Sequence, residues 1–255
     1  MDAYLLTMAA ILGAIAGSFI NALSYRFNTG RGMGGRSYCD TCGHTLGVLD
    51  LVPILSYLFL RGRCRYCRAK ISIQNVLVEI AAASLGALTW HTTPSLTAFA
   101  FWFFVWMVLL FVVVYDLKHT IIPWRCSILL GVLALFSLFF NLNTFEFALP
   151  SLTAALSGPA LALPLFLLSL VSGGRWMGWG DSALELSLGW FLGLVMGATA
   201  LMCAFWSGAI IGIALIAFKK GLKMGSELPF APFLVLGMFL VYFFHVDFFS
   251  MVSFW

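Results

Sequence analysis

Four cysteines form the most specific chemical pattern in this sequence. Cys39 and Cys42 make one C-x2-C pair, and Cys64 and Cys67 make a second pair after a gap of 21 residues. Each pair can present two thiolates to one tetrahedral Zn²⁺ ion. Two disulfides or four uncommitted thiols are the alternatives, and a reducing cytoplasm disfavours the disulfides. Because four thiolates leave no coordination position for water, the predicted zinc is structural and not catalytic.

Two aspartates beside long apolar segments could do acid–base chemistry. Asp116 ends one such segment and Asp181 begins another, and charges in apolar surroundings are costly enough to suggest a function. If the two carboxyl groups met around a common water, they could not both ionise cheaply, so the pair would hold one proton. The ionised carboxylate could then take a proton from water while its protonated partner donates to a substrate carbonyl oxygen. This chemistry hydrolyses a peptide without a metal.

Structural roles for the same aspartates stay open at this point. Asp181 could be only a helix cap, and Asp116 could be only the solvated end of a span beside Lys118. Gly178 and Gly180 precede Asp181, and glycine would let an extended substrate approach the backbone closely. The spacing alone therefore suggests a catalytic pair without establishing one.

The chain that must position these groups has the composition of an integral membrane protein. Of its 255 residues, 62% are hydrophobic and only 9% are charged, whereas a soluble domain carries about 25% charged residues. This deficit excludes an ordinary soluble protein, a disordered chain and a nucleic-acid-binding protein. We therefore expect a lipid bilayer as its surroundings, and the sequence leaves the oligomeric state open.

Eight apolar segments approach the length of about 20 residues that a transmembrane helix needs. They lie at 3–25, 71–90, 97–116, 122–141, 149–172, 182–198, 201–218 and 229–250. Strand signals are absent. We therefore predict an all-α polytopic fold of about eight transmembrane helices with a small zinc-binding cytoplasmic insertion between the first two. The predicted domains are the first helix at 1–25, the insertion at 26–70 and a seven-helix core at 71–255.

The basic residues fall in alternate connections between these segments. By the positive-inside rule this pattern predicts a cytoplasmic location for four connections and an outside location for both termini. The four connections are 26–70, 117–121, 173–181 and 219–228. Both aspartates then lie at the cytoplasmic face. The boundary between the sixth and seventh segments is the least defined, because only Gly189, Gly193 and Gly197 suggest a bend there.

An ordered set of motifs resembles the type IV prepilin peptidases, which are membrane aspartyl peptidases of the GxGD type. The motifs are Gly17-Ser18-Phe19-Ile20-Asn21 with Tyr25-Arg26, the paired cysteines, Pro53-Ile54-Leu55-Ser56-Tyr57, Leu60-Arg61-Gly62-Arg63-Cys64, Val78-Glu79, Asp116 with Ile122-Pro123, Gly178-x-Gly180-Asp181, and Glu227-Leu228-Pro229-Phe230-x-Pro232-Phe233. The resemblance covers most of the chain. It departs from the family at Ala183, where a lysine is usual, and at Ala231, where a glycine is usual.

The resemblance implies that Asp116 and Asp181 are the catalytic pair of a leader peptidase in the bacterial inner membrane. Such an enzyme cleaves the short basic leader of prepilins and pseudopilins after a glycine, at the cytoplasmic face. Many members also methylate the new N-terminal amine with S-adenosylmethionine, a role tied to the cytoplasmic insertion. The insertion here is consistent with a bifunctional enzyme.

Two glutamates have several possible roles. Glu79 could position a substrate amine, take part in methyl transfer or steady the insertion, or it could be a polar contact between helices. Glu227 could bind the leader, take part in methyl transfer or pair with Lys223, or it could be an ordinary loop charge.

Two other functions compete with the peptidase. A small transporter or proton-coupled channel with membrane carboxylates is the first alternative, but transporter sites lie near the midplane between repeats, and no repeat is visible here. A zinc-bearing membrane scaffold without catalysis is the second. Only a peptidase accounts for both the aspartates and the insertion.

Overall fold

The computed structural model describes residues 2–27, 35–218 and 229–248. Within these ranges the regular secondary structure is helical, with three isolated β-bridges. The helices are α1 (Asp2–Arg26), η1 (Val48–Asp50), α2 (Leu55–Phe59), α3 (Ile73–Thr92), α4 (Leu96–His119), α5 (Trp124–Phe139), α6 (Leu152–Ser172), α7 (Trp179–Leu192), α8 (Leu194–Phe218) and α9 (Ala231–Phe244). The prediction of an all-helical protein is confirmed.

Five of these helices are long and apolar enough to cross a membrane, namely α1, α3, α4, α6 and α8. The helices α5 and α9 are apolar but shorter, with 16 and 14 residues. The helix α7 has 14 residues and carries two buried carboxyl groups. Each of the eight predicted segments therefore contains a helix, and the five long ones make this a membrane protein by length and composition.

The predicted break between the sixth and seventh segments was wrong. The prediction placed it at 199–200, but α7 ends at Leu192 and α8 begins at Leu194. Gly193 separates them with a φ of 78°, a left-handed conformation that glycine adopts without the steric cost of a side chain. Hydropathy could not locate this break because the residues on both sides are apolar.

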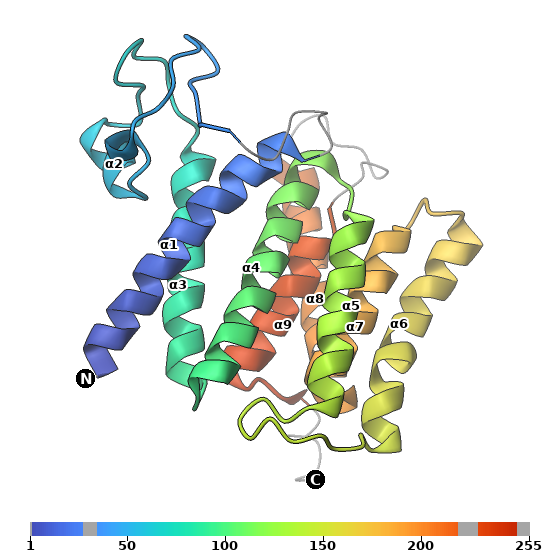
Figure 1. The fold of residues 1–255 in the computed structure, drawn as a ribbon. Helices are drawn as coiled ribbons and strands as arrows, with labels where there is room; N and C mark the ends of the chain where they lie inside the picture. The colour runs from blue at the N-terminus through green and yellow to red at the C-terminus, as the bar shows by residue number, and fades with distance from the viewer. Residues whose placement is uncertain (1, 28–34, 219–228, 249–255) are drawn as a thin grey trace. The chain divides into compact units, whose positions relative to one another are not determined.

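The chain forms two compact units, and the first comprises Met1–Val114. In it α1 packs against α3, and residues 35–72 fold at one end of the pair (Figure 1). Small residues allow the close contact: a side chain at Gly13 would collide with the backbone of Ala82, and one at Gly17 would meet Glu79 Cα at 2.9 Å. Such small-residue contacts are typical of helices that associate in membranes.

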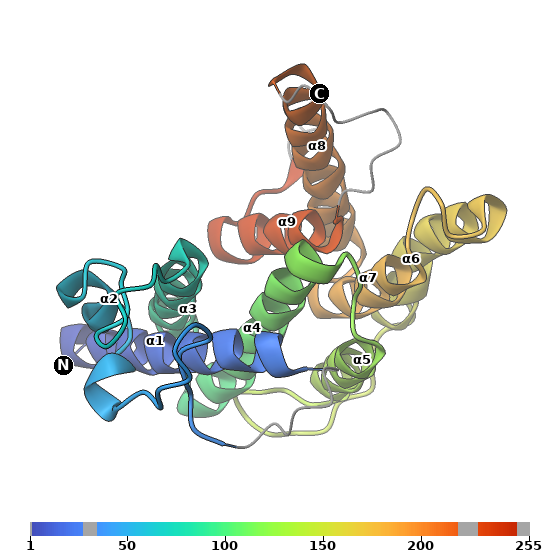
Figure 2. The ribbon, with the colours of Figure 1, turned by 90° about the horizontal axis from the view of Figure 1, so that it is seen from above.

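The second unit comprises Tyr115–Trp255. Its central element is α7, which contacts α5, α6, α8 and α9 (Figure 2). Polar contacts fix α7 against α6: Ser157 Oγ donates to the carbonyl of Gly189 at 2.9 Å, and Trp190 Nε1 donates to the carbonyl of Ala155 at 2.9 Å. The helix that begins with the GxGD sequence is therefore held on all sides.

Candidate active site and metal centre

Asp181 is fixed at the start of α7 by its own helix. It is the third residue of the helix, is 8% exposed, and accepts a hydrogen bond through Oδ2 from the backbone N–H of Gly178 at 3.0 Å. Its side chain thus caps the helix N-terminus. This contact occupies one carboxyl oxygen and holds the side chain in one orientation.

Ser169 of α6 fixes the loop that precedes α7. This residue is fully buried, and its hydroxyl donates to the carbonyls of Met177 at 3.0 Å and Gly178 at 3.3 Å. The hydroxyl therefore satisfies two backbone carbonyls beside the aspartate. Ser169 could not be selected from the sequence, because a serine in an apolar segment gives little signal of a function.

Asp116 is fixed by a segment far away in the chain. It lies one turn before the end of α4, is 4% exposed, and accepts a hydrogen bond through Oδ2 from the N–H of Ala231 at 3.2 Å. Ala231 is the first residue of α9, and a helix N-terminus is a favourable place for a carboxylate. The family-typical glycine is replaced at this position, yet the backbone N–H still reaches the carboxyl group.

The two aspartates lie close enough to interact electrostatically. The first turn of α7 approaches the loop that follows α4 at Gly180, where an added Cβ would be 2.8 Å from Cβ of Ile122. The contact brings the first turn of α7 against the turn that follows Asp116. The arrangement therefore joins two buried carboxyl groups, each with one oxygen held by a backbone N–H.

A third buried carboxyl group follows one turn later on α7. Glu185 is 2% exposed, and its Oε1 has no hydrogen-bond partner among the described residues. It stands on the same helix as Asp181, whereas Ala183 occupies the position where the family usually has a lysine. The structure therefore has no cation at Ala183 to balance the two carboxyl groups of α7.

The four cysteines lie together in the first unit. Their Sγ atoms all lie within 4.8 Å of one another, and those of Cys39 and Cys67 are 3.8 Å apart. A tetrahedral site with Zn–S bonds of about 2.3 Å has sulfur atoms about 3.8 Å apart. None of the described cysteines forms a disulfide. The four thiols therefore lie close enough together to bind one tetrahedral metal ion.

The two halves of this cluster share one local structure. The first knuckle (residues 38–45) is closed by a bridge between Tyr38 and Thr45, and the second knuckle (residues 63–70) by one between Arg63 and Lys70. The N–H of Cys39 bonds the carbonyl of His44 at 3.0 Å, and that of Cys64 bonds the carbonyl of Ala69 at 2.8 Å. The spacing of each C-x2-C pair thus gives the same turn twice.

Backbone groups favour the thiolate form of Cys39, whereas the Cys67 thiol, despite a lowering hydrogen bond from the N–H of Ala69, has its pKa raised to about 11 by desolvation and the three neighbouring thiols. Hydrogen bonds from the backbone N–H groups of Cys42 and Thr41 lower the pKa of the Cys39 thiol to about 6. Thiolate is the form that binds metals. The first knuckle is therefore suited to present a charged sulfur near neutral pH.

Asp50 links the segment between the knuckles to the second knuckle. Its carboxyl group pairs with Arg65 Nε at 2.7 Å, accepts from the hydroxyl of Tyr66 at 3.4 Å, and accepts from the N–H of Gly47 at 3.1 Å. The ring of Tyr66 in turn packs on His44 of the first knuckle, with centroids 3.6 Å apart. Asp50 gave no signal in the sequence, because these partners become neighbours only on folding.

Glu79 joins this segment to α3. It is 8% exposed, and its Oε2 accepts a hydrogen bond from the N–H of Ile54 at 2.7 Å. Ile54 has a φ of 62°, which is unusual for a β-branched residue. Among the expected roles of Glu79, the contact supports the steadying of the insertion. Glu227, the other predicted glutamate, lies outside the described residues.

Comparisons with known proteins agree with these features. The family described as the bacterial peptidase A24 N-terminal domain matches residues 11–93. A prepilin leader peptidase/N-methyltransferase from Dichelobacter nodosus is 34% identical over 81% of this chain and 70% of its own. Proteins of the same name from Burkholderia pseudomallei (strain K96243) and Pseudomonas putida are 32% and 28% identical, over 97% and 92% of this chain and 88% of their own chains. No solved structure matches significantly.

Proposed function

The chain belongs to the prepilin leader peptidase/N-methyltransferase family, and on this basis we propose that it cleaves the basic leader of type IV prepilins and pseudopilins. The observation that carries the proposal is the pair of buried carboxyl groups at Asp116 and Asp181, which interact across two helix ends of one unit. A purely structural pair of this kind would be costly, because each buried carboxylate loses its hydration.

In the proposed reaction the two aspartates share one proton and one water molecule. The ionised carboxylate removes a proton from the water, whose oxygen attacks the carbonyl carbon of the scissile peptide. The protonated carboxyl group donates its proton to the carbonyl oxygen. The group that took the proton of water then gives it to the leaving nitrogen as the C–N bond breaks, and the other carboxylate takes back a hydroxyl proton as the carbonyl re-forms. The hydrogen bonds from Gly178 and Ala231 support this role, because they hold one oxygen of each group and leave the other for water or substrate.

The four-cysteine cluster is proposed to hold one structural Zn²⁺ ion. Cys39, Cys42, Cys64 and Cys67 fit this ion in donor type and in spacing. When bound, the ion would join the two knuckles, and four sulfur ligands would leave no position for catalysis. The peptidase reaction is therefore expected not to require the metal.

The names of the relatives also support a second activity, methylation of the new N-terminal amine with S-adenosylmethionine. In that reaction the neutral amine nitrogen takes the methyl group, the carbon–sulfur bond breaks, S-adenosylhomocysteine leaves, and the product amine releases a proton. Both reactions act on the same end of the processed protein. We therefore propose a bifunctional enzyme.

The proposed location is the bacterial inner membrane, with the insertion and the aspartates on the cytoplasmic side and both termini outside. The positions of the basic residues support this orientation. A basic leader awaiting cleavage would lie on the same side, since it is held there by the same rule.

The decisive experiment is incubation of the purified full-length protein in detergent with a prepilin-like peptide. Mass spectrometry should detect loss of the leader without any added cofactor, and a gain of one methyl group only when S-adenosylmethionine is present. A chelator should leave the leader cleavage in place over the time of the assay. A folded protein that cleaves no prepilin-type peptide would contradict the proposal.

A further inference from the structure

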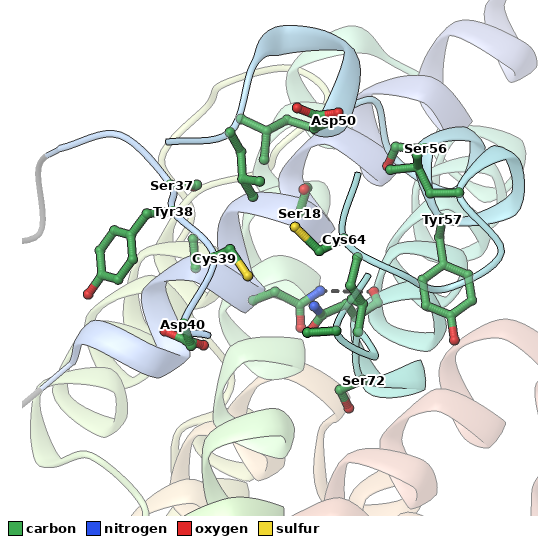
Figure 3. Close-up of a pocket in the computed structure, with 18 of the residues that line it drawn as sticks. Ser18, Ser37, Tyr38, Cys39, Asp40, Asp50, Ser56, Tyr57, Cys64 and Ser72 are labelled. Carbon is green, nitrogen blue, oxygen red and sulfur yellow. Dashed lines mark hydrogen bonds between the residues drawn. The ribbon is translucent and has the colours of Figure 1, made fainter. Parts of the chain in front are cut away.

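A cavity in the first unit is not used by the peptidase site. It has a volume of about 460 Å³ and lies between α1, α3 and the four-cysteine segment. Figure 3 shows Ser18 of α1, Ser72 at the start of α3 and Tyr57 of α2 around it, together with Cys39 and Cys64 of the two knuckles. Its volume falls in the range of about 300–1,000 Å³ that is typical of sites for small molecules.

Two amide oxygens in this cavity are buried without a partner. Asn21 of α1 is 5% exposed and donates its Nδ2 to the backbone carbonyl of Asn75 at 2.9 Å, which leaves its Oδ1 unbonded. The side-chain Oδ1 of Asn75 is also buried and unbonded. Both residues line the cavity. Buried acceptors usually have donors, so a ligand that brings hydrogen atoms or positive charge would satisfy them.

Glu79 adds a negative charge to the same wall. Its Oε2 is held by the N–H of Ile54 at 2.7 Å, and its side chain lines the cavity. Two other carboxylates line the cavity: Asp50 is paired with Arg65, and Asp40 is an exposed residue of the first knuckle. Lys70 also lines the cavity and makes no ion pair in the described part of the chain. The cavity thus offers hydrogen-bond acceptors from α1 and α3 to a cationic group of a ligand, and it offers Lys70 to a carboxylate group.

We propose that this cavity binds S-adenosylmethionine and that Asn21, Asn75 and Glu79 hold its cationic methionine portion. The inference rests on the proposed methyl transfer and assigns it a site. S-adenosylmethionine carries a sulfonium and an α-ammonium group, which are stabilised by acceptor oxygens and negative charge. It also carries an α-carboxylate, which can pair with the ammonium group of Lys70. Tyr57, which lines the cavity, offers an aromatic face to the adenine. The cavity therefore fits the donor in volume, charge and hydrogen bonding.

Two substitutions test the site without removing known structural contacts. Glu79→Gln removes the charge but keeps an oxygen that can accept from Ile54. Asn75→Ala removes the unbonded oxygen and leaves the backbone carbonyl that Asn21 uses. Ser84→Ala is the matched control on the same helix, because Ser84 is exposed and its hydroxyl bonds only to Ile80 of its own helix.

Binding of radiolabelled S-adenosylmethionine to each full-length variant should be measured by equilibrium dialysis, beside leader cleavage of a prepilin-like peptide. We expect each cavity substitution to weaken binding by about tenfold or more, since hydrogen bonds to charged groups contribute about 1.5–3 kcal/mol. The control should bind like the unaltered protein, and all variants should retain cleavage. Ultraviolet crosslinking of the bound donor should label peptides that contain residues 18–26 or 72–79.

Unaltered affinity for S-adenosylmethionine in both cavity variants would overturn the assignment. Crosslinks that fall only in other parts of the chain would also overturn it. Variants that bind S-adenosylmethionine normally but lose affinity for the peptide would overturn it as well, because the cavity would then hold the methyl acceptor. Failure of the peptidase proposal gives a different result: the unaltered protein would cleave no peptide, whatever its affinity for the donor.

Discussion

The thiol cluster and the aspartate site are assembled in different ways. Each knuckle brings two of the four sulfur atoms together within a single turn, closed by its own backbone hydrogen bonds. The carboxyl groups of Asp116 and Asp181 instead come from two helices, and the N–H that holds Asp116 comes from a third. The metal site therefore depends on local turns joined by one ion, whereas the aspartate site depends on the packing of whole helices.

This difference predicts which substitutions affect which site. A change inside a knuckle should alter metal content before it alters peptide cleavage. A change where helices meet in the second unit should alter peptide cleavage and leave the metal in place.

Asp116→Asn and Asp181→Asn should each reduce the rate of leader cleavage by about 10²–10⁴-fold, the usual contribution of general acid–base catalysis. Asparagine keeps an oxygen that can accept from Ala231 or Gly178, so the helices should remain in place. Initial rates on a prepilin-like peptide measure the effect. Glu146→Gln is the control, since Glu146 is an exposed carboxylate of the same unit. A variant that cleaves at the normal rate would remove its aspartate from the proposed chemistry.

Gly180→Ala should reduce cleavage by up to about 10²-fold, because small displacements of catalytic groups have effects of this size. Its new Cβ would be 2.8 Å from Cβ of Ile122, so the start of α7 must shift. Gly131→Ala is the matched control, because its Cβ would meet only Ser187 Oγ at 3.7 Å. Zinc content should be normal in both variants, measured by elemental analysis. Equal rates for the two would show that close contact at Gly180 does not position Asp181.

Cys42→Ser should lower bound zinc from about one ion per chain to almost none, because a structural site needs all four ligands. Limited proteolysis should then cut residues 35–70 faster, since the ion no longer joins the knuckles. Leader cleavage should fall less than in the aspartate and Gly180 variants. Cys203→Ser, in α8 of the second unit, serves as the control, because Cys203 is not one of the four clustered cysteines. Loss of cleavage as complete as in Asp116→Asn would show that the two sites are not separable.

Ser169→Ala should have the smallest effect, a few-fold decrease in cleavage, because a single hydrogen bond contributes about 0.5–1.5 kcal/mol. The carbonyls of Met177 and Gly178 lose their shared donor, which loosens the turn before Asp181. Thermal unfolding and pH–rate profiles should be recorded together. Ser137→Ala, whose hydroxyl bonds only within α5, is the comparison. A normal rate and an unchanged pH profile would limit Ser169 to a role in stability.

Much of this architecture was predictable from particular residues. Hydropathy indicated a helix in each of the eight segments, and the two C-x2-C pairs indicated the turns that hold the thiols. Hydropathy alone did not place the break at Gly193, because both flanking helices are equally apolar, although Gly193 was one of three glycines that suggested a bend. It also gave no reason to select Ser169 or Asp50, whose partners lie on other elements or appear only after folding.

The helical membrane fold and the donor types at both sites follow from the sequence, because long apolar segments and short-range cysteine spacing act through local physical rules. Three features required the folded chain: Asp116 accepts from the first N–H of α9, Glu79 accepts from the N–H of Ile54, and two amide oxygens line a cavity without partners. Each of these contacts joins residues that are distant in the chain. Such contacts follow from how helices pack, and packing depends on the shapes of many side chains at once.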